Sequence, residues 1–135
     1  MKKFIVILVS AACAGLLLVS CNDNRTKASD VSLDFLNAYF STDYNKAASF
    51  CDDSLSSKLL EACQNFENLD STIKADIISS SKNIKFSINS SKKINDSLME
   101  VSYQAEITSD TAPIESKMIL KKSDETWKIT ELGSL

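Results

Sequence analysis

The chain has 135 residues, a formal net charge of −3 and a hydrophobic content of 44%. This length suits one domain with a real core. Histidine is absent, which removes the commonest general base and the commonest metal ligand. Two glycines and one proline exclude a glycine-rich phosphate loop and a proline-rich linker. Acidic and basic residues are interspersed without a basic cluster, so we expect no nucleic-acid partner. We also expect no cofactor.

Residues 1–20 have the layout of a secretory signal peptide, because two lysines precede an apolar stretch over residues 4–19. The stretch is slightly short for a membrane span, which needs ~20 residues. It ends in "LVSC", which resembles the bacterial lipobox, where a lipid joins the cysteine thiol and the chain is cut just before it. The resemblance implies a lipid on Cys21 and a place in the bacterial cell envelope, anchored to the outer membrane on its periplasmic or surface-exposed face. The alternative is an uncleaved membrane helix that tethers an equally exported chain.

Residues 21–28 follow as the lipid-bearing cysteine and a short polar tether, and residues 29–135 are expected to form a single domain. In the N-terminal part of this domain, apolar residues recur every three or four positions, and this pattern predicts four helices. Three of these helices have candidate N-caps, which are Ser29 or Asp30, Asp53 or Ser54, and Asp70 or Ser71.

Cys51 and Cys63 are an even pair in a chain predicted to be exported, which suggests a disulfide. Twelve residues of continuous helix span ~18 Å, whereas bridged Cα atoms lie ~5–6 Å apart. A bond therefore requires a break in the helix between the two cysteines. The alternative is that both are small buried residues with free thiols. Two cysteines alone do not make a metal site.

The second part of the chain predicts strands, because the apolar period changes from about four to two. Residues 84–89 and 99–107 alternate in two strands, residues 114–120 form a third, and Trp127 and Ile129 lie in a fourth. Short polar turns separate them. Helices followed by closely connected strands predict an α+β fold, with N-terminal helices packed on one face of a four-stranded antiparallel meander sheet.

Two stretches resemble nuclear transport factor 2-like domains. The sequence "DVSLDFLNAYFSTDYNKAASFC" is similar to their opening helices, and "MILKKSDETWKITEL" is similar to their closing hairpin. The resemblance covers most of residues 29–132 and implies a domain of the kind found in small bacterial lipoproteins of unknown function. Many members insert a β-hairpin between the second and third helices, whereas residues 54–80 here predict helix throughout. A simpler cystatin-like arrangement of helices on a meander is therefore an alternative to a full cone-shaped pocket.

Enzymes with this fold place a carboxylate in the cavity, as the resemblance implies. The candidate carboxylates are Asp43, Asp52, Asp53, Glu100 and Glu106. Helix capping explains the three aspartates, and the strand alternation places the two glutamates on the polar sheet face. No residue is therefore assigned as catalytic, cofactor-binding or metal-binding.

The apolar face of the strands is the expected lining of any cavity between sheet and helices. The residues concerned are Met99, Val101, Tyr103, Ala105, Ile107 and Trp127. Such a cavity suits an apolar molecule better than acid–base chemistry. The alternative is that these side chains interdigitate and leave no cavity. We thus expect a non-enzymatic domain that binds a small apolar ligand or an envelope protein, with an isomerase- or dehydratase-like enzyme as the alternative function.

We predict that Cys21→Ala yields a precursor without acyl groups, because the thiol is the attachment point. The measurement is the intact mass of the chain after expression in a bacterial host. Acyl groups on the variant would contradict the assignment of the lipobox.

Overall fold

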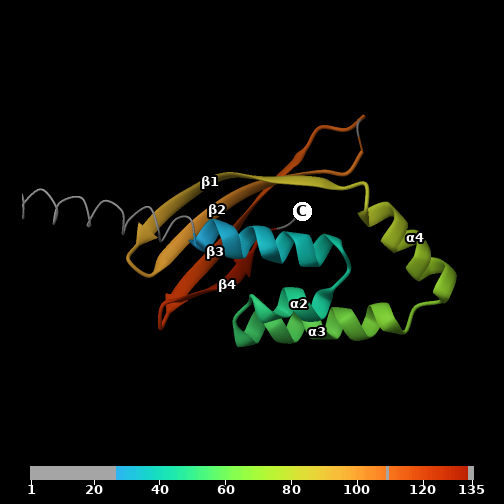
Figure 1. The fold of residues 1–135 in the computed structure, drawn as a ribbon, viewed down its shortest axis with the longest axis horizontal. Helices are drawn as coiled ribbons and strands as arrows, with labels where there is room; N and C mark the ends of the chain where they lie inside the picture. Colours follow the sequence, from blue (N-terminus) through green and yellow to red (C-terminus); the bar gives the residue numbers. More distant parts are fainter. Residues whose placement is uncertain (1–26, 109, 134–135) are drawn as a thin grey trace, which may run out of the picture.

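The computed structural model describes residues 27–108 and 110–133, so residues 1–20 and Cys21 lie outside the described part. Helices come first and strands follow (Figure 1). In chain order the elements are a helix over residues 27–40, α2 (Tyr44–Ser49), α3 (Asp53–Glu67), α4 (Ser71–Ser81), β1 (Lys85–Asn95), β2 (Leu98–Glu106), β3 (Ile114–Ser123) and β4 (Thr126–Leu132). This order confirms the predicted α+β class.

Aspartate side chains are the N-caps of three helices. Each accepts a hydrogen bond from a backbone N–H of the first turn. Asp43 caps α2 through Lys46 N, Asp52 caps α3 through Leu55 N, and Asp70 caps α4 through Thr72 N. The predicted N-cap of α3, Asp53 or Ser54, is wrong, because the cap is Asp52, one residue earlier. A cap at Ser29 or Asp30 is also wrong, because the chain is already helical at residue 27.

The four strands form one antiparallel sheet in the order β1-β2-β3-β4, which confirms the predicted meander. Val101 pairs with Met118 and Met99 with Leu120, so the apolar residues of β2 and β3 share a face. The strand predicted over residues 84–89 is longer in the structure, because β1 continues through a bulge after Ile88. The bulge interrupts the alternation of half-buried and exposed residues along β1. The second half of the strand therefore does not continue the period-two pattern of residues 84–89.

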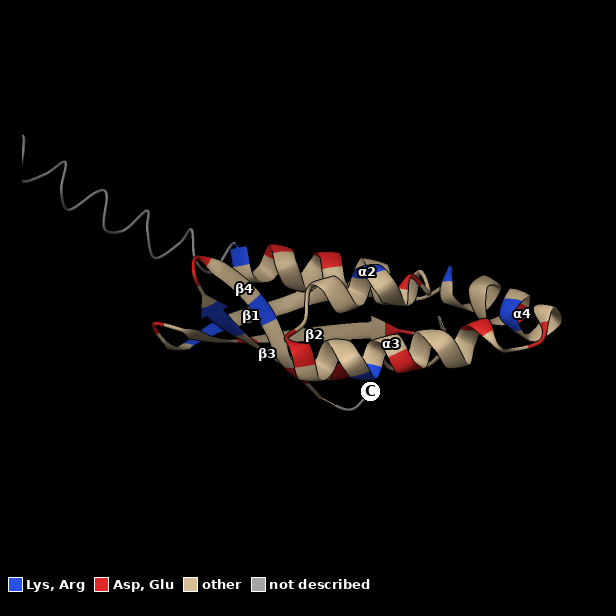
Figure 2. Cartoon of the chain, turned by 90° about the horizontal axis from the view of Figure 1, so that it is seen from below, with Lys and Arg blue, Asp and Glu red and all other residues tan. Residues whose placement is uncertain are grey.

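The core lies between the inner face of the sheet and the 27–40 helix, which crosses that face in Figure 1. Phe35 and Leu36 of the helix are 2% and 1% exposed, and Val101 and Leu120 of the sheet are fully buried. The opposite sheet face carries polar side chains, such as Glu100, which pairs with Lys117 at 3.1 Å. Charged residues of both signs are scattered along the elements (Figure 2).

The junction between α2 and α3 is attached to β4 as if it were a fifth strand. Ile129 donates its N–H to the carbonyl of Phe50 and accepts a hydrogen bond from Asp52 N, both at 2.9 Å. Cys51 and Ile129 thereby form a parallel bridge. Lys128 Nζ adds a hydrogen bond to the carbonyl of Ser49 at 2.7 Å.

α4 stands apart from the sheet at one end of the molecule (Figure 1). No residue of α4 is buried. Its half-buried residues are Lys74, Ile77 and Ser81, which share one side of the helix. Lys74 holds α4 to α3, because its Nζ lies 3.0 Å from a carboxylate oxygen of Glu67 and 5.9 Å from the ring centroid of Phe66.

Cys51 and Cys63 carry free thiols in the structure, so it shows no disulfide between these two residues. The Cys51 thiol is buried and lies 3.5 Å from the carbonyl oxygen of Ala47. Burial above all, with the nearby Asp52 carboxylate, raises the pKa of the Cys51 thiol to about 12, although Lys128 opposes the shift. Cys63 is only half-buried.

We predict that Trp127→Ala lowers the free energy of unfolding by ~3–5 kcal/mol, because Trp127 is 3% exposed and packs in the core. Trp127→Phe is expected to cost less. Its ring keeps much of the packing, and the change removes a buried indole N–H that has no hydrogen-bond acceptor. Urea unfolding measures both variants, and an unchanged midpoint for Trp127→Ala would contradict the burial.

We also predict that iodoacetamide at pH 8 alkylates Cys63 and spares Cys51. With a pKa of about 12, only about one Cys51 thiol in ten thousand is ionised at that pH. Peptide mapping by mass spectrometry identifies the modified residue, and urea should expose both. If neither residue reacts in urea until a reductant is added, the two cysteines are bridged.

Candidate functional site

The residues predicted to line a cavity lie mostly in the packed core. Five of them are at most 3% exposed, namely Met99, Val101, Tyr103, Ala105 and Trp127. None of the five lines either pocket described below. The sheet face is closed by packing against the 27–40 helix and α2. The placement of Ile107 on this face is corrected, because Ile107 lies beyond the end of β2 and is 48% exposed.

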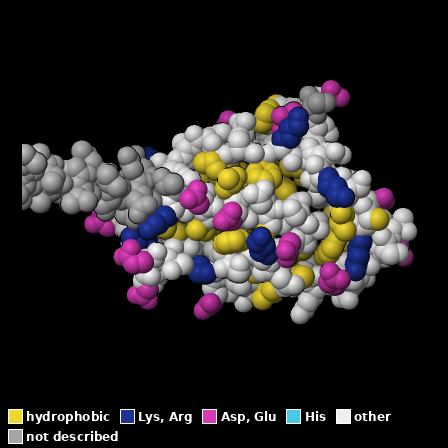
Figure 3. Space-filling model, in the orientation of Figure 1, with side chains coloured by type: hydrophobic (Ala, Val, Ile, Leu, Met, Phe, Trp, Pro, Cys, Tyr) yellow, Lys and Arg dark blue, Asp and Glu magenta, His cyan; other side chains and the backbone are white. Residues whose placement is uncertain are grey.

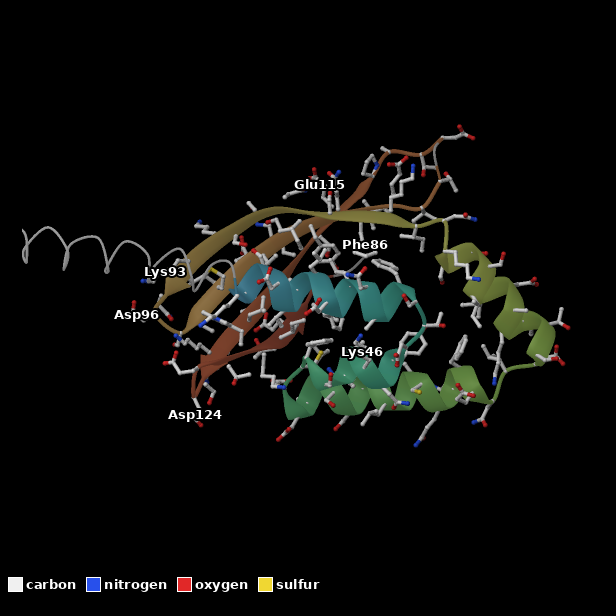
Figure 4. The ribbon with its side chains drawn as sticks, viewed as in Figure 1. Lys46, Phe86, Lys93, Asp96, Glu115 and Asp124 are labelled. Carbon is white, nitrogen blue, oxygen red and sulfur yellow. The ribbon has the colours of Figure 1, made fainter. Side chains whose placement is uncertain are left out.

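An inner pocket of about 240 Å³ lies where the 27–40 helix, α4 and the start of β1 meet. Its lining residues are Asn37, Phe40, Ser41, Ile78, Ser81, Lys82, Ile84 and Phe86. Phe86 projects from β1 toward the 27–40 helix in Figure 4. Its ring stacks on Phe40, with centroids 5.3 Å apart and planes at 26°. The pocket thus combines an aromatic pair and two isoleucines with a few polar groups, as ligand sites commonly do.

The aromatic pair continues into a chain of rings that runs from the inner pocket to α3. Tyr39 lies 5.4 Å from Phe40 and 5.7 Å from Tyr44, and Tyr44 lies 5.6 Å from Phe66, all measured between ring centroids. Burial raises the pKa of the Tyr44 hydroxyl, with smaller contributions from Tyr39 and Cys63. Tyr44 is therefore a neutral member of this chain at ordinary pH. Edge-to-face and stacked contacts of this kind are worth ~0.5–1.5 kcal/mol each.

Hydrophobic side chains also gather on the surface beside α4. Figure 3 shows them as a band with charged side chains around it. Leu69, Ile73 and Ile78 are 37%, 49% and 38% exposed. Ile73 and Ile78 lie on either side of the half-buried Ile77, because residues 73, 77 and 78 occupy neighbouring positions on one surface of α4. The apolar rim of the inner pocket therefore extends along α4.

An outer pocket of about 520 Å³ lies on the other side of the segment that links α4 to β1. It is lined by Ser80, Asn83, Lys85, Glu106, Ile107 and Thr108. Lys85 and Glu106 are partners in the β1–β2 register and so project on the same side of the sheet. Glu106 is the one carboxylate among the residues that line the two pockets.

The other candidate carboxylates have structural roles. Asp43 and Asp52 accept backbone hydrogen bonds as N-caps, and Asp53 is exposed in the first turn of α3. Glu100 forms its ion pair with Lys117 on the outer sheet face.

Within residues 27–108 and 110–133, no group of three or more metal-ligating side chains comes together. None of the helices in this part of the chain is long and apolar enough to cross a membrane.

Sequence reasoning missed the inner pocket, although it left one signal. The predicted fourth helix carries the apolar residues Ile73, Ile77 and Ile78, and Ile78 lines the inner pocket. Asn37, Ser41 and Lys82 carry no sequence pattern, because they belong to helix ends that only the tertiary fold brings together.

Comparison with known proteins supports the fold. No family model matches the chain, and no curated protein matches it. A solved structure that it resembles is an NTF-2-like protein of unknown function from Shewanella oneidensis MR-1. The two chains are 14% identical with a TM-score of 0.50, over 76% of this chain and 94% of that chain. The likeness shows an NTF-2-like α+β fold, in which helices are followed by a four-stranded antiparallel sheet.

Proposed function

We propose that this protein is an exported lipoprotein that binds a small molecule without catalysing a reaction. Residues 1–20 direct export, Cys21 carries the lipid, and the tether holds the domain close to the membrane of the bacterial envelope. Each buried lipid methylene contributes ~0.8 kcal/mol, so two or more acyl chains give a stable anchor.

The orientation of the domain suits this proposal. In the first turn of the 27–40 helix, Ser29 Oγ lies 2.5 Å from Ser91 Oγ of β1. At the other end of the same helix, Phe40 lines the inner pocket. In Figure 4 Lys93 and Asp96 mark the hairpin at the end of the sheet opposite α4. The 27–40 helix spans ~20 Å, so the inner pocket lies at the end of the domain away from the tether.

The observation that carries the proposal is the lining of the inner pocket. Phe40, Phe86, Ile78 and Ile84 provide apolar surface, and no carboxylate lies among its lining residues. Acid–base catalysis needs a proton-transfer group within hydrogen-bond reach of the substrate. A pocket of this composition is better suited to holding a ligand than to transforming it.

The proposal predicts that filling the inner pocket abolishes ligand binding. Ser81 is half-buried and lines the pocket, so the ring of Ser81→Phe should occupy part of its volume. Fragment compounds are screened by saturation-transfer NMR against the full chain in lipid nanodiscs, with empty nanodiscs as background. We expect hits whose affinity falls tenfold or more in Ser81→Phe.

Ser79→Phe is the matched control. Ser79 is exposed on the same helix and lies on the side opposite Ser81. The control should keep the wild-type affinity, and urea unfolding shows whether each variant is folded. The absence of any hit, or hits that bind Ser81→Phe as tightly as wild type, would overturn small-molecule binding at this site.

A further inference from the structure

We propose that the inner pocket takes a small carboxylic acid with an aromatic or branched aliphatic body, acquired from solution. This inference rests on the proposed function and adds the class of ligand. It places the body of the ligand against Phe40, Phe86, Ile78 and Ile84, and the carboxylate beside the ammonium of Lys82.

The apolar side of the pocket determines the body of the ligand. Phe40 and Phe86 are already stacked, so a further planar or branched group extends the stack from the pocket side. The volume of about 240 Å³ lies below the ~300–1,000 Å³ typical of pockets for drug-sized ligands. A body of one ring or one short branched chain therefore fits, and a long acyl chain does not.

Lys82 determines the polar end of the ligand. It is the only charged side chain among the residues that line the inner pocket. None of the ion pairs among the described residues involves Lys82. Lys82 is exposed at the rim of the pocket, and no carboxylate lies among the lining residues, so its positive charge attracts an anion by Coulomb interaction. Asn37, Ser41 and Ser81 supply neutral hydrogen-bonding groups beside it.

Two helix ends meet at the pocket and also affect its electrostatics. A helix C-terminus carries a partial negative charge, which Lys82 offsets for α4. The terminal carbonyls are largely satisfied inside the chain. Ile78 O and Ser80 O accept from Lys82 N, and Asn37 O accepts from both the N–H and the hydroxyl of Ser41. The full charge of Lys82 thus outweighs the partial charges that remain for a ligand to meet.

The test compares 4-phenylbutyrate with the uncharged 4-phenylbutyramide. Both are titrated into the full chain in nanodiscs of zwitterionic lipid, with isoleucine methyl groups labelled for NMR. We expect both probes to shift the methyl signals of Ile78 and Ile84, and the acid to bind about tenfold more tightly than the amide. In Lys82→Met the preference for the acid should disappear while the affinity for the amide stays.

Lys58→Met is the matched control, because Lys58 is an exposed helical lysine that lines neither pocket. It removes the same charge and should keep the preference for the acid. Equal affinities of the two probes in wild type, or a preference that survives in Lys82→Met, would overturn the class of ligand and leave small-molecule binding intact. If millimolar amounts of both probes leave Ile78 and Ile84 unshifted, the ligand class and the proposed function both fail at this pocket.

A final arm separates a dissolved acid from a membrane lipid, because both present an anionic group. Nanodiscs that contain phosphatidylglycerol are examined without any probe. We expect the signals of Ile78 and Ile84 to match those in zwitterionic nanodiscs. Shifts caused by the anionic lipid alone would make the membrane the source of the ligand and overturn uptake from solution.

Discussion

The attachment of the α2–α3 junction to β4 is the constraint on which the arrangement of the helices depends. The backbone of Ile129 bonds to Phe50 and Asp52, so the junction covers the edge of the sheet. An edge strand left open would expose unpaired N–H and carbonyl groups. Because Asp52 is also the N-cap of α3, the same few residues fix both the end of the sheet pairing and the start of the next helix.

The inner pocket follows from this attachment. The chain leaves the β4 edge at Asp52 and must reach β1, which is the opposite edge of the sheet. α3 has 15 residues, so it carries the chain ~22 Å along the molecule before α4 turns back toward β1. α4 therefore closes one end of the domain as a wall rather than covering the sheet. The aromatic chain from Phe86 to Phe66 fills the region behind it only in part, and the remaining space is the pocket.

The sequence predicts the parts of this fold that local patterns determine. Alternation over residues 99–106 determines which face of β2 is buried, and aspartates at 43 and 70 mark helix starts. The bulge after Ile88 is not visible in the sequence, because it breaks the alternation. The inner pocket is not visible either. Phe40 and Phe86 are far apart in the chain and meet only after the sheet and the helices have packed.

The weak attachment of α4 links its stability to ligand binding. α4 has no buried residue, and Lys74 links it to α3 through an ion pair with Glu67 and a contact with the Phe66 ring. Few buried apolar contacts mean a low free energy of local opening. A ligand in the inner pocket adds contacts to Ile78 and Ser81 on the side of α4 that faces the core. A ligand that binds only when α4 is packed in place stabilises this packed state by mass action. Occupancy of the pocket and order in α4 therefore rise together.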